Sequence, residues 1–265
     1  KPLGMKVFQQ LWHGGHHVMP LDGSPPWSAS DQPSPVLGIV PLAMTHSMID
    51  DIVTAFADAA RRCEEWGLDG IELHAAHGYL MHQFLSPISN QRQDSYGGSF
   101  DNRIRMPLQV FSAVRQAFSG TLGMRISGTD WVDGGWTIEE TAELALRLKT
   151  AGAQFVHISS GGVSPLQKIT LVPEYQVPFA KRVREHSGLT TFAVGLITEP
   201  QQAEAVLARG DADLVAMARA FLYKPRWGWE AAAALKGQVT AKEQYWRCMP
   251  REAQHIFAKV RIGAR

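Results

Sequence analysis

The 265-residue chain is 45% hydrophobic and 19% charged, a composition typical of globular proteins that excludes disordered and fibrous classes. Its 26 basic and 25 acidic residues give a formal net charge of +1 without runs of like charge, so we expect no nucleic-acid partner. The two cysteines, Cys63 and Cys248, form no C-x-x-C pair, which argues against a disulfide framework or a cysteine metal site. No apolar run reaches the roughly 18 residues of a membrane span, and Lys1 to Lys6 lack the layout of a signal peptide. We therefore expect a soluble, cytoplasmic protein that contacts no membrane.

The chain opens with a short apolar segment and a long irregular one. Met5 to Trp12 is short and apolar enough for a buried strand, and the Gly14-Gly15 pair after it is typical of a loop. Residues 16–42 are rich in proline, glycine and serine, which predicts an irregular but ordered loop. The histidines at positions 13, 16 and 17 stand where the strand opens onto a pocket. They could shape substrate choice or be ordinary solvated loop residues.

The next segment predicts an amphipathic helix. Apolar residues from Ile49 to Cys63 keep the i, i+3, i+4, i+7 rhythm, with Thr45 or Ser47 as the N-cap and Gly67 as the stop. After it, short apolar runs predict five further strands, which are Gly70–His74, Gly123–Ser127, Phe155–Ser160, Thr191–Leu196 and Asp213–Arg219. Amphipathic stretches between them predict helices, which are Ser99–Phe118, a helix opened by the capping box Thr137–Glu140, Tyr175–Glu185 and Thr198–Ala208. Pro107 predicts a kink in the first of these, and a tryptophan-rich helical tail follows the last strand.

This alternation predicts one α/β domain over residues 1–265. Single strands that alternate with helices imply a parallel sheet covered by helices. The sheet is either open and doubly wound or closed as a barrel, and periodicity alone does not choose between them. No linker or internal repeat divides the chain.

The densest group of chemically active side chains is His74, His77 and Tyr79, directly after a predicted strand, where α/β proteins place their active-site loops. Neutral imidazoles donate hydrogen bonds to a substrate oxygen, and an unperturbed phenol stays protonated at neutral pH and can act as an acid. The trio therefore suits polarising a carbonyl and delivering a proton. Two other interpretations remain open at this point: helix capping with core packing, and a zinc site that adds His82 but lacks a fourth ligand.

Residues 74–98, HAAHGYLMHQFLSPISNQRQDSYGG, closely resemble the signature of old yellow enzyme-like flavin oxidoreductases. The resemblance continues through residues 99–103, Arg125, residues 194–197 and residues 212–215, and it covers most of the chain. In that family a (β/α)8 barrel, the TIM barrel, holds FMN at the C-terminal ends of its strands. The resemblance thus implies a single flavin-binding barrel domain where periodicity left the fold open.

The resemblance also implies roles for the trio. His74 and His77 would bind the carbonyl oxygen of an enone or the carboxamide of the nicotinamide, and Tyr79 would protonate the substrate α-carbon. The expected reaction is reduction of an activated C=C bond by NADPH or NADH, in two hydride transfers of a ping-pong cycle. The physiological alkene, the preferred nicotinamide and homo-oligomer formation are left open.

Six residues resemble the FMN contacts of the family. Gln10 corresponds to the glutamine at the flavin pyrimidine edge, and Arg125 to the arginine near flavin N1 and O2, with a salt-bridged rim residue as the alternative for Arg125. After the last two strands, where barrels commonly bind phosphate, stand the pairs Gly195-Leu196 and Ala218-Arg219. The family usually has glycine where Ala218 stands, which alters the expected approach to the phosphate.

The resemblance is incomplete at the front of the domain. A (β/α)8 barrel needs eight strands, six are predicted, and Gln10 belongs to what is normally the third, so about the first two strands are absent from this chain. The chain is then a fragment of a longer protein, is completed by other chains, or binds flavin poorly. The alternatives to a reductase are a truncated or inactive barrel with a structural or interaction role, and a flavin amine dehydrogenase or N-demethylase. The trimethylamine type of the latter has tyrosine at the position of His74 and a cysteine cluster, and both are lacking here.

Overall fold

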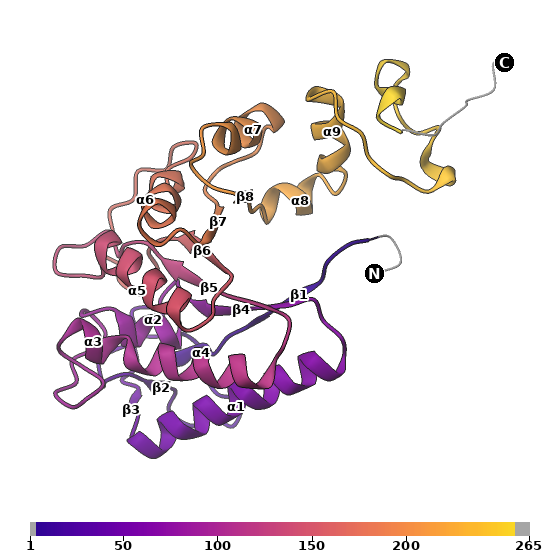
Figure 1. Ribbon diagram of the computed structural model, residues 1–265. Coiled ribbons are helices and arrows are strands. Elements are labelled where there is room, and N and C mark those ends of the chain that lie inside the picture. The colour runs from indigo at the N-terminus through magenta and orange to yellow at the C-terminus, as the bar shows by residue number, and fades with distance from the viewer. Residues whose placement is uncertain (1–3, 258–265) are drawn as a thin grey trace.

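The computed structural model describes residues 4–257 (Figure 1). Six parallel strands form one sheet in chain order: β1 (Phe8–Leu11), β4 (Gly70–Ala75), β5 (Thr121–Ser127), β6 (Phe155–Ser159), β7 (Thr190–Ala193) and β8 (Leu214–Val215). The longer helices that connect these strands are α1 (His46–Glu65), α4 (Arg105–Ala117), α5 (Ile138–Thr150), α6 (Val177–Ser187) and α7 (Pro200–Ala208). The predicted parallel α/β alternation is confirmed. The prediction of one domain over 1–265 includes residues 1–3 and 258–265, which lie outside the described part.

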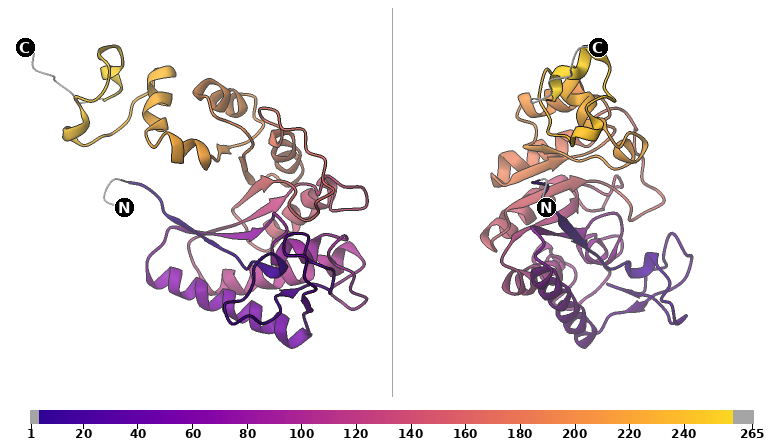
Figure 2. Two further views of the ribbon diagram at one scale, coloured as in Figure 1. Left: turned by 180° about the vertical axis from the view of Figure 1, so that it is seen from behind. Right: turned by 90° about the vertical axis from the view of Figure 1, so that its right-hand side faces the viewer.

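The sheet is an open arc. Within residues 4–257, β1 pairs with β4 alone and β8 pairs with β7 alone, so the described strands do not close into a barrel. Figures 1 and 2 show the helices on the outer face of the arc, with β1 and α8 (Arg219–Tyr223) on opposite sides of its opening. The α1 and α4 helices pack against each other, as do α5 and α6. The inner face of the strands is consequently accessible from the open side.

Strand register places chemically related residues in one row across the sheet. His74 on β4 is paired with Arg125 on β5, Arg125 with His157 on β6, and His157 with Phe192 on β7. Because side chains alternate between the two faces of a strand, residues of one row project to the same face. That face is the inner surface of the arc, and the row lies near the C-terminal strand ends.

The helices begin and end where local capping chemistry requires. Thr45 caps α1 by accepting a hydrogen bond from the Met48 amide, and Gly67 follows the helix with a φ of +65°. Thr137 and Glu140 form both hydrogen bonds of the predicted capping box at the start of α5. Both predicted helix starts are confirmed at residue level.

Some local predictions are wrong. The helix expected over Ser99–Phe118 is two helices, α3 (Phe100–Arg103) and α4, with the break at Ile104; Pro107 has no N–H for the Arg103 carbonyl and sits in the first turn of α4. The last strand is shorter than Asp213–Arg219, because the chain turns into α8 at Arg219.

Other elements were not predicted. The helix α2 (Leu80–Leu85) follows the His74–Tyr79 segment directly. In the loop of residues 16–42 and just beyond it lie the 3-10 turn η1 (Gly15–His17) and the paired short strands β2 (Trp27–Ser28) and β3 (Leu42–Ala43).

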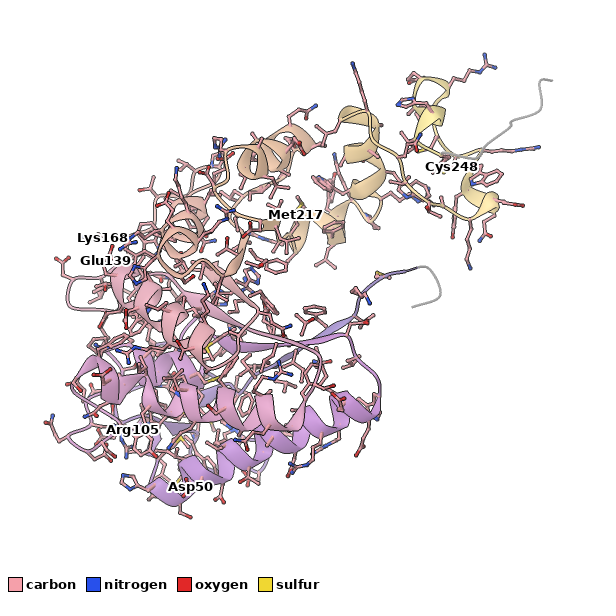
Figure 3. The ribbon with its side chains drawn as sticks, viewed as in Figure 1. Asp50, Arg105, Glu139, Lys168, Met217 and Cys248 are labelled. Carbon is pink, nitrogen blue, oxygen red and sulfur yellow. The ribbon has the colours of Figure 1, made fainter. Side chains whose placement is uncertain are left out.

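The C-terminal segment carries α9 (Trp227–Ala234), η2 (Glu243–Tyr245) and η3 (Arg251–Ile256). Ala232, Ile256 and Phe257 form a small second core there. Figure 3 shows Cys248 in this segment, which extends away from the sheet, whereas Cys63 is buried in α1. Among the described residues, no helix is long and apolar enough to cross a membrane.

Candidate active site

The candidate site lies at the C-terminal end of β4, where a buried strand delivers His74 to the inner face of the sheet. His74 is 5% exposed, and the ring of Tyr79 meets it edge-on at 5.0 Å between centroids. The His77 ring also meets His74 edge-on at 5.0 Å. Trp12, which follows β1, covers the other side of Tyr79 at 4.8 Å. The structure therefore brings the three predicted residues into one cluster and adds an aromatic wall.

A directed chain of hydrogen bonds fixes the two imidazoles. The Ala76 amide donates to His74 Nδ1 at 3.2 Å, which leaves the His74 proton on Nε2. His74 Nε2 lies 3.3 Å from His77 Nδ1, and His77 Nε2 lies 2.7 Å from the Ser159 hydroxyl. In this series of hydrogen bonds His74 Nε2 donates to His77 Nδ1 and His77 Nε2 donates to Ser159, so both rings carry their proton on Nε2. Each imidazole is a neutral donor.

Burial keeps both rings uncharged. Burial and then the nearby Arg125 charge, opposed by Glu72, lower the pKa of His74 to about 4. Burial, followed by the same Arg125 charge and by the neighbouring His74 ring, lowers the pKa of His77 to about 2. Neutral N–H groups at pH 7 can polarise a carbonyl oxygen without themselves giving up a proton.

The turn between the two histidines and the tyrosine has a left-handed backbone. His77 has a φ of +59° and Gly78 a φ of +74°. A Cβ on Gly78 would lie 2.2 Å from the Gly162 carbonyl oxygen, and a Cβ on Gly162 would lie 2.4 Å from the His77 backbone. The Ser127 hydroxyl accepts the His77 amide at 3.0 Å. Two glycines and the ends of β5 and β6 thus hold this turn against the sheet.

Arg125 and Gln10 lie on the inner face near this cluster, where Gln10 and His157 share the Glu72 carboxylate. Gln10 Nε2 donates to Glu72, and His157 Nδ1 lies 2.9 Å from the other carboxylate oxygen. Burial would raise the pKa of Glu72, but the hydrogen bonds of His157 and Gln10 and the charges of His157 and Arg125 outweigh it, so this pKa is lowered. The Arg125 Nε is buried without a hydrogen-bond partner. Phe8, Phe155 and Phe192 complete the wall of a cavity of about 540 Å³ here.

The two candidate phosphate-binding pairs follow β7 and β8. Gly195 has a φ of +123°, and its carbonyl accepts the Glu174 amide at 2.9 Å, whereas Leu196 follows with a φ of +52°. Ala218 and Arg219 are exposed at the start of α8. The Arg219 charge acts on Tyr175, whose pKa is raised by burial and lowered in part by that charge. Both pairs therefore border the segment around residues 174–176.

The chain matches the model of the NADH:flavin oxidoreductase / NADH oxidase family over residues 1–238. It belongs to that family. The resemblance to old yellow enzyme-like flavin oxidoreductases is confirmed, and this family consists of NAD(P)H:flavin oxidoreductase enzymes.

Named relatives agree with the family assignment. An NADPH dehydrogenase of Geobacillus sp. (strain WCH70) is 42% identical over 93% of this chain and 72% of its own length. An NADPH dehydrogenase of Geobacillus thermodenitrificans (strain NG80-2) is 46% identical over 78% of this chain and 61% of its own length. The structure of morphinone reductase in complex with tetrahydroNAD covers 86% of this chain and 67% of that protein, with 28% identity and a TM-score of 0.70. The chain thus spans about two thirds of the length of these family members.

The zinc interpretation is wrong for the described residues. His82 is turned away from His74 and His77, because its Nδ1 accepts the Gly78 amide and its Nε2 faces Asp130. Within residues 4–257, no group of three or more His, Cys, Asp or Glu side chains could hold a metal ion.

Several polar residues of the site were missed in the sequence. Ser127 and Ser159 end β5 and β6, Glu72 and His157 lie on the inner face, and Gln176 accepts hydrogen bonds from Ser159 and Ser160. The usable signal was position: polar residues at the ends of consecutive buried strands converge on one edge of a parallel sheet. The alternation of inward residues would have found Glu72 and His157 in the same way.

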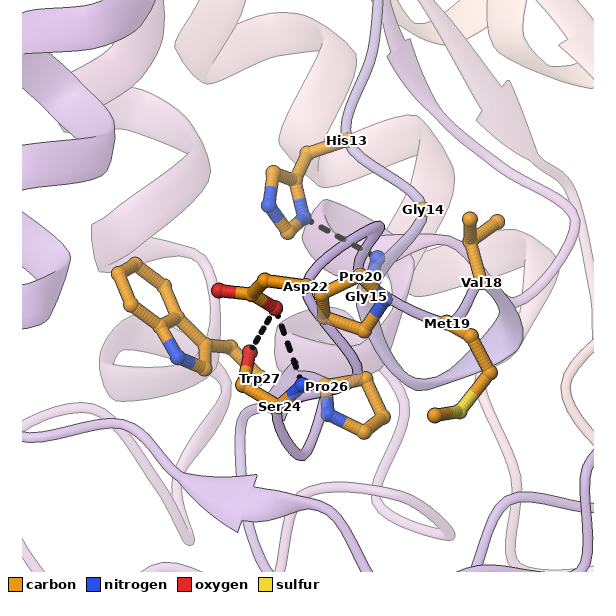
Figure 4. A pocket seen from close by; sticks show the side chains of 10 residues that line it. All are labelled: His13, Gly14, Gly15, Val18, Met19, Pro20, Asp22, Ser24, Pro26 and Trp27. Atoms are coloured by element: carbon orange, nitrogen blue, oxygen red, sulfur yellow. Dashed lines mark hydrogen bonds between the residues drawn. The ribbon is translucent and has the colours of Figure 1, made fainter.

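The predicted loop after β1 forms a second hollow, shown in Figure 4. A cavity of about 340 Å³ lies between His13, the Gly14–Pro20 stretch and Trp27. The Gly15 amide donates to His13 Nδ1 at 3.1 Å, and the Ser24 hydroxyl donates to Asp22 at 2.7 Å. The His13 carbonyl accepts the Leu80 amide, so this loop is tied to the start of α2 next to Tyr79.

Proposed function

We propose that this chain is the catalytic part of an FMN-dependent reductase that reduces activated C=C bonds with NADPH or NADH. The observation that carries the proposal is the cluster of His74, His77 and Tyr79, two neutral N–H donors and one phenol, near the partly buried side chain of Arg125. Such a cluster suits a small substrate with an oxygen to polarise and a carbon to protonate. The names of the relatives, NADPH dehydrogenase and morphinone reductase, support the nicotinamide and the reduction.

The residues present fit FMN. Arg125 offers a buried Nε with no partner among the described residues, which suits an anionic or carbonyl edge of a ring system. Gln10, whose amide nitrogen is engaged by Glu72, has its oxygen left for a donor of the same ring. The backbone of Gly195-Leu196 and of Ala218-Arg219, with the Arg219 charge, would hold the phosphate. When bound, FMN would supply the hydride acceptor and donor that links the nicotinamide to the substrate.

The protein groups then act on the substrate. His74 and His77 would exchange their present partners, His77 and Ser159, for the substrate carbonyl oxygen, and their N–H groups would stabilise the negative charge that develops there. Tyr79 would transfer its phenolic proton to the α-carbon. Neutrality of both imidazoles at pH 7 keeps the proton delivery assigned to Tyr79 alone. The nicotinamide carboxamide would use the same two donors in the other half of the cycle.

The first test is substitution of Tyr79. A positioned general acid contributes about 10² to 10⁴ in rate, so Tyr79→Phe should slow reoxidation by cyclohexenone within that range and leave flavin bleaching by NADPH unchanged. Stopped-flow absorbance of the purified protein, loaded with FMN under anaerobic conditions, measures both steps. Tyr245→Phe, in the C-terminal segment, is the matched control and should leave both rates unchanged. Equal slowing of the two steps by Tyr79→Phe would remove Tyr79 from this role.

The visible absorption spectrum of the purified protein, recorded before and after addition of FMN, tests whether the domain is complete. We propose that two further strands, absent from the described residues, close the arc into a (β/α)8 barrel in the functional protein. The accessible inner face of β1 and β8 and the two-thirds coverage of the relatives support this proposal. A chain that rejects FMN alone but binds it once two further strands are supplied would support this proposal, and rejection in both forms would favour a barrel part with a structural or interaction role.

A further inference from the structure

A second polar pair lies behind the turn that carries His77 and Tyr79. His82, on α2, and Asp130, in the segment after β5, have fully buried side chains, and His82 Nε2 lies 2.9 Å from Asp130 Oδ1. The other carboxylate oxygen accepts the Ser86 hydroxyl at 2.6 Å and the Trp136 amide at 2.7 Å. Neither residue belongs to the trio. A pair this deeply buried is costly unless each of its polar groups has a defined partner.

The other ring nitrogen of His82, Nδ1, contacts the turn that carries His77 and Tyr79. The Gly78 amide donates to His82 Nδ1 at 2.9 Å, so the His82 proton resides on Nε2 and faces Asp130. The Gly78 amide is thus hydrogen-bonded to the His82 ring, whose other nitrogen lies at ion-pair distance from Asp130 and makes no regular hydrogen bond among the described residues. Gly78 is the residue between His77 and Tyr79.

The turn has an unfavourable backbone conformation that depends on contacts from the surrounding structure. His77 and Gly78 both have positive φ, which is unfavourable for histidine. The Gly78 carbonyl accepts Gln83 Nε2 at 2.5 Å, and the Tyr79 amide donates to the Ala76 carbonyl at 3.2 Å. If His82 Nδ1 were removed, the buried Gly78 amide would lose its acceptor, and an unpaired buried donor drives a backbone to move.

We propose that His82 and Asp130 are positioning residues that hold the His77–Tyr79 turn so that the Tyr79 phenol stays aimed at the substrate α-carbon. This inference rests on the proposed function, in which Tyr79 supplies the proton. Asp130 orients the imidazole, the imidazole accepts the Gly78 amide, and Gly78 sets the start of α2 at Tyr79.

Two substitutions of His82 separate the contacts. Asparagine places its side-chain oxygen near the position of Nδ1, so His82→Asn keeps an acceptor for Gly78 and loses the reach to Asp130. Glutamine places its amide near the position of Nε2, so His82→Gln keeps a donor for Asp130 and loses the acceptor for Gly78. Both variants replace the imidazole ring by an acyclic amide side chain, so both lose the packing of the ring.

The expected result is an unequal loss of activity. Since a misplacement of about 1 Å can cost about 10²-fold in rate, His82→Gln should slow reoxidation by cyclohexenone by a factor of about 10 to 10². Bleaching by saturating NADPH needs no proton from Tyr79 and should fall by a smaller factor. His82→Asn should retain most of the reoxidation rate. A pair that only stabilised the core would instead lower the free energy of unfolding in both variants and leave the ratio of the two rates unchanged.

A structural readout keeps the test independent of turnover. In wild-type protein labelled with ¹⁵N-histidine, His82 should show an unprotonated Nδ1 and a protonated Nε2. In protein labelled with ¹⁵N-glycine, the Gly78 amide should exchange slowly in wild type and His82→Asn and at least 10-fold faster in His82→Gln. A protonated Nδ1, or equal protection in both variants, overturns the proposal. A protein that binds no flavin but shows the expected amide protection would refute the proposed function while leaving the positioning contact in place.

Discussion

Burial decides the charge of individual side chains around the candidate site. Desolvation lowers the pKa of His16, His17 and His74 to about 4, and that of His77 to about 2. The neighbouring imidazoles also disfavour a proton, His17 on His16 and His82 on His17. At His74 the Arg125 charge has the same effect. In an unfolded chain the same imidazoles titrate near 6.5. The proposed donors His74 and His77 must be uncharged at neutral pH. The same lowered pKa values should make the folded protein less stable in acid.

The first prediction concerns acid stability. As pH falls below about 6.5, the unfolded state takes up protons that the folded His74 refuses until about 4, so the free energy of unfolding falls across this window. Between pH 7 and 5 one such histidine accounts for at most about 2 kcal/mol. Urea unfolding at both values should show a smaller acid loss for His74→Gln than for wild type. The exposed control His255→Gln should lose as much free energy of unfolding as wild type. An equal loss in all three proteins would show that the pKa of His74 is not lowered in the folded state.

At the scale of elements, the site depends on close approach of two loops. The turn at His77-Gly78 and the segment at Gly161-Gly162 meet backbone to backbone, and this contact joins the end of β4 to the end of β6. Substitution of either glycine at the contact adds a side chain where no space exists. Such a contact transmits any shift of one loop to the other, because neither backbone can yield independently.

The second prediction concerns this contact. Gly162→Ala combines a φ of +101° with a Cβ only 2.4 Å from the His77 backbone, so it should destabilise the protein by about 3 kcal/mol or more and displace His77. Gly134→Ala also stands at a positive φ, +73°, but its Cβ would meet no atom within 4 Å. It should cost about 1 kcal/mol. Thermal unfolding of both variants measures the difference, and similar losses would show that the two loops are not in contact.

The elements show which sequence signals are local. The capping box at Thr137 and the cap at Thr45 were readable because capping depends on residues within four positions. The helix α2 was missed because all six of its residues are buried, so no polar face gives it a helical period. The kink was predicted at Pro107, but the break lies at Ile104. The N–H that proline lacks would have bonded to a carbonyl one turn earlier, so its effect appears before the proline.

At the scale of the whole molecule, the open arc exposes what a closed sheet would bury. Phe8 on β1 is 40% exposed and Leu214 on β8 is 42% exposed, and both line the inner cavity of about 540 Å³. Each of these two strands has one hydrogen-bonded neighbour among the described residues. Unpaired edges and an accessible apolar interior favour association with other polypeptide segments.

The third prediction follows from this surface. The 265-residue chain should enhance the fluorescence of the apolar dye ANS, because the dye can enter the inner cavity. The double substitution Phe8→Gln and Leu214→Gln should reduce that enhancement at least about twofold, since it removes apolar area from opposite sides of the opening. Leu166→Gln, at a residue that is 71% exposed outside this cavity, is the control and should change little. Equal fluorescence in all three proteins would mean that the inner face is covered in solution.

The site was predictable only in part, for reasons of distance along the chain. His74, His77 and Tyr79 are neighbours in sequence, and Arg125 stands near the end of a readable strand, so their grouping followed from the alternation and from family resemblance. The path from Asp130 to Gly78 joins residues 52 positions apart, from 78 to 130, and the row of His74 with His157 spans two strand pairings. Contacts of this kind arise from sheet register, which periodicity does not contain.

Sheet register also makes the spacing of these groups independent of every loop around them. His74, Arg125 and His157 are held in line by backbone hydrogen bonds between adjacent strands, so neighbouring members sit about one strand separation, roughly 4.8 Å, apart whatever the intervening segments do. Insertions in the long segment of residues 16–42 would leave the spacing of these three side chains unchanged. Deletion of one residue within β5 would reverse its faces and bring Met124 or Ile126 inward in place of the guanidinium. A change in strand length would therefore disturb the site, whereas changes in loop length would leave the spacing of these groups intact.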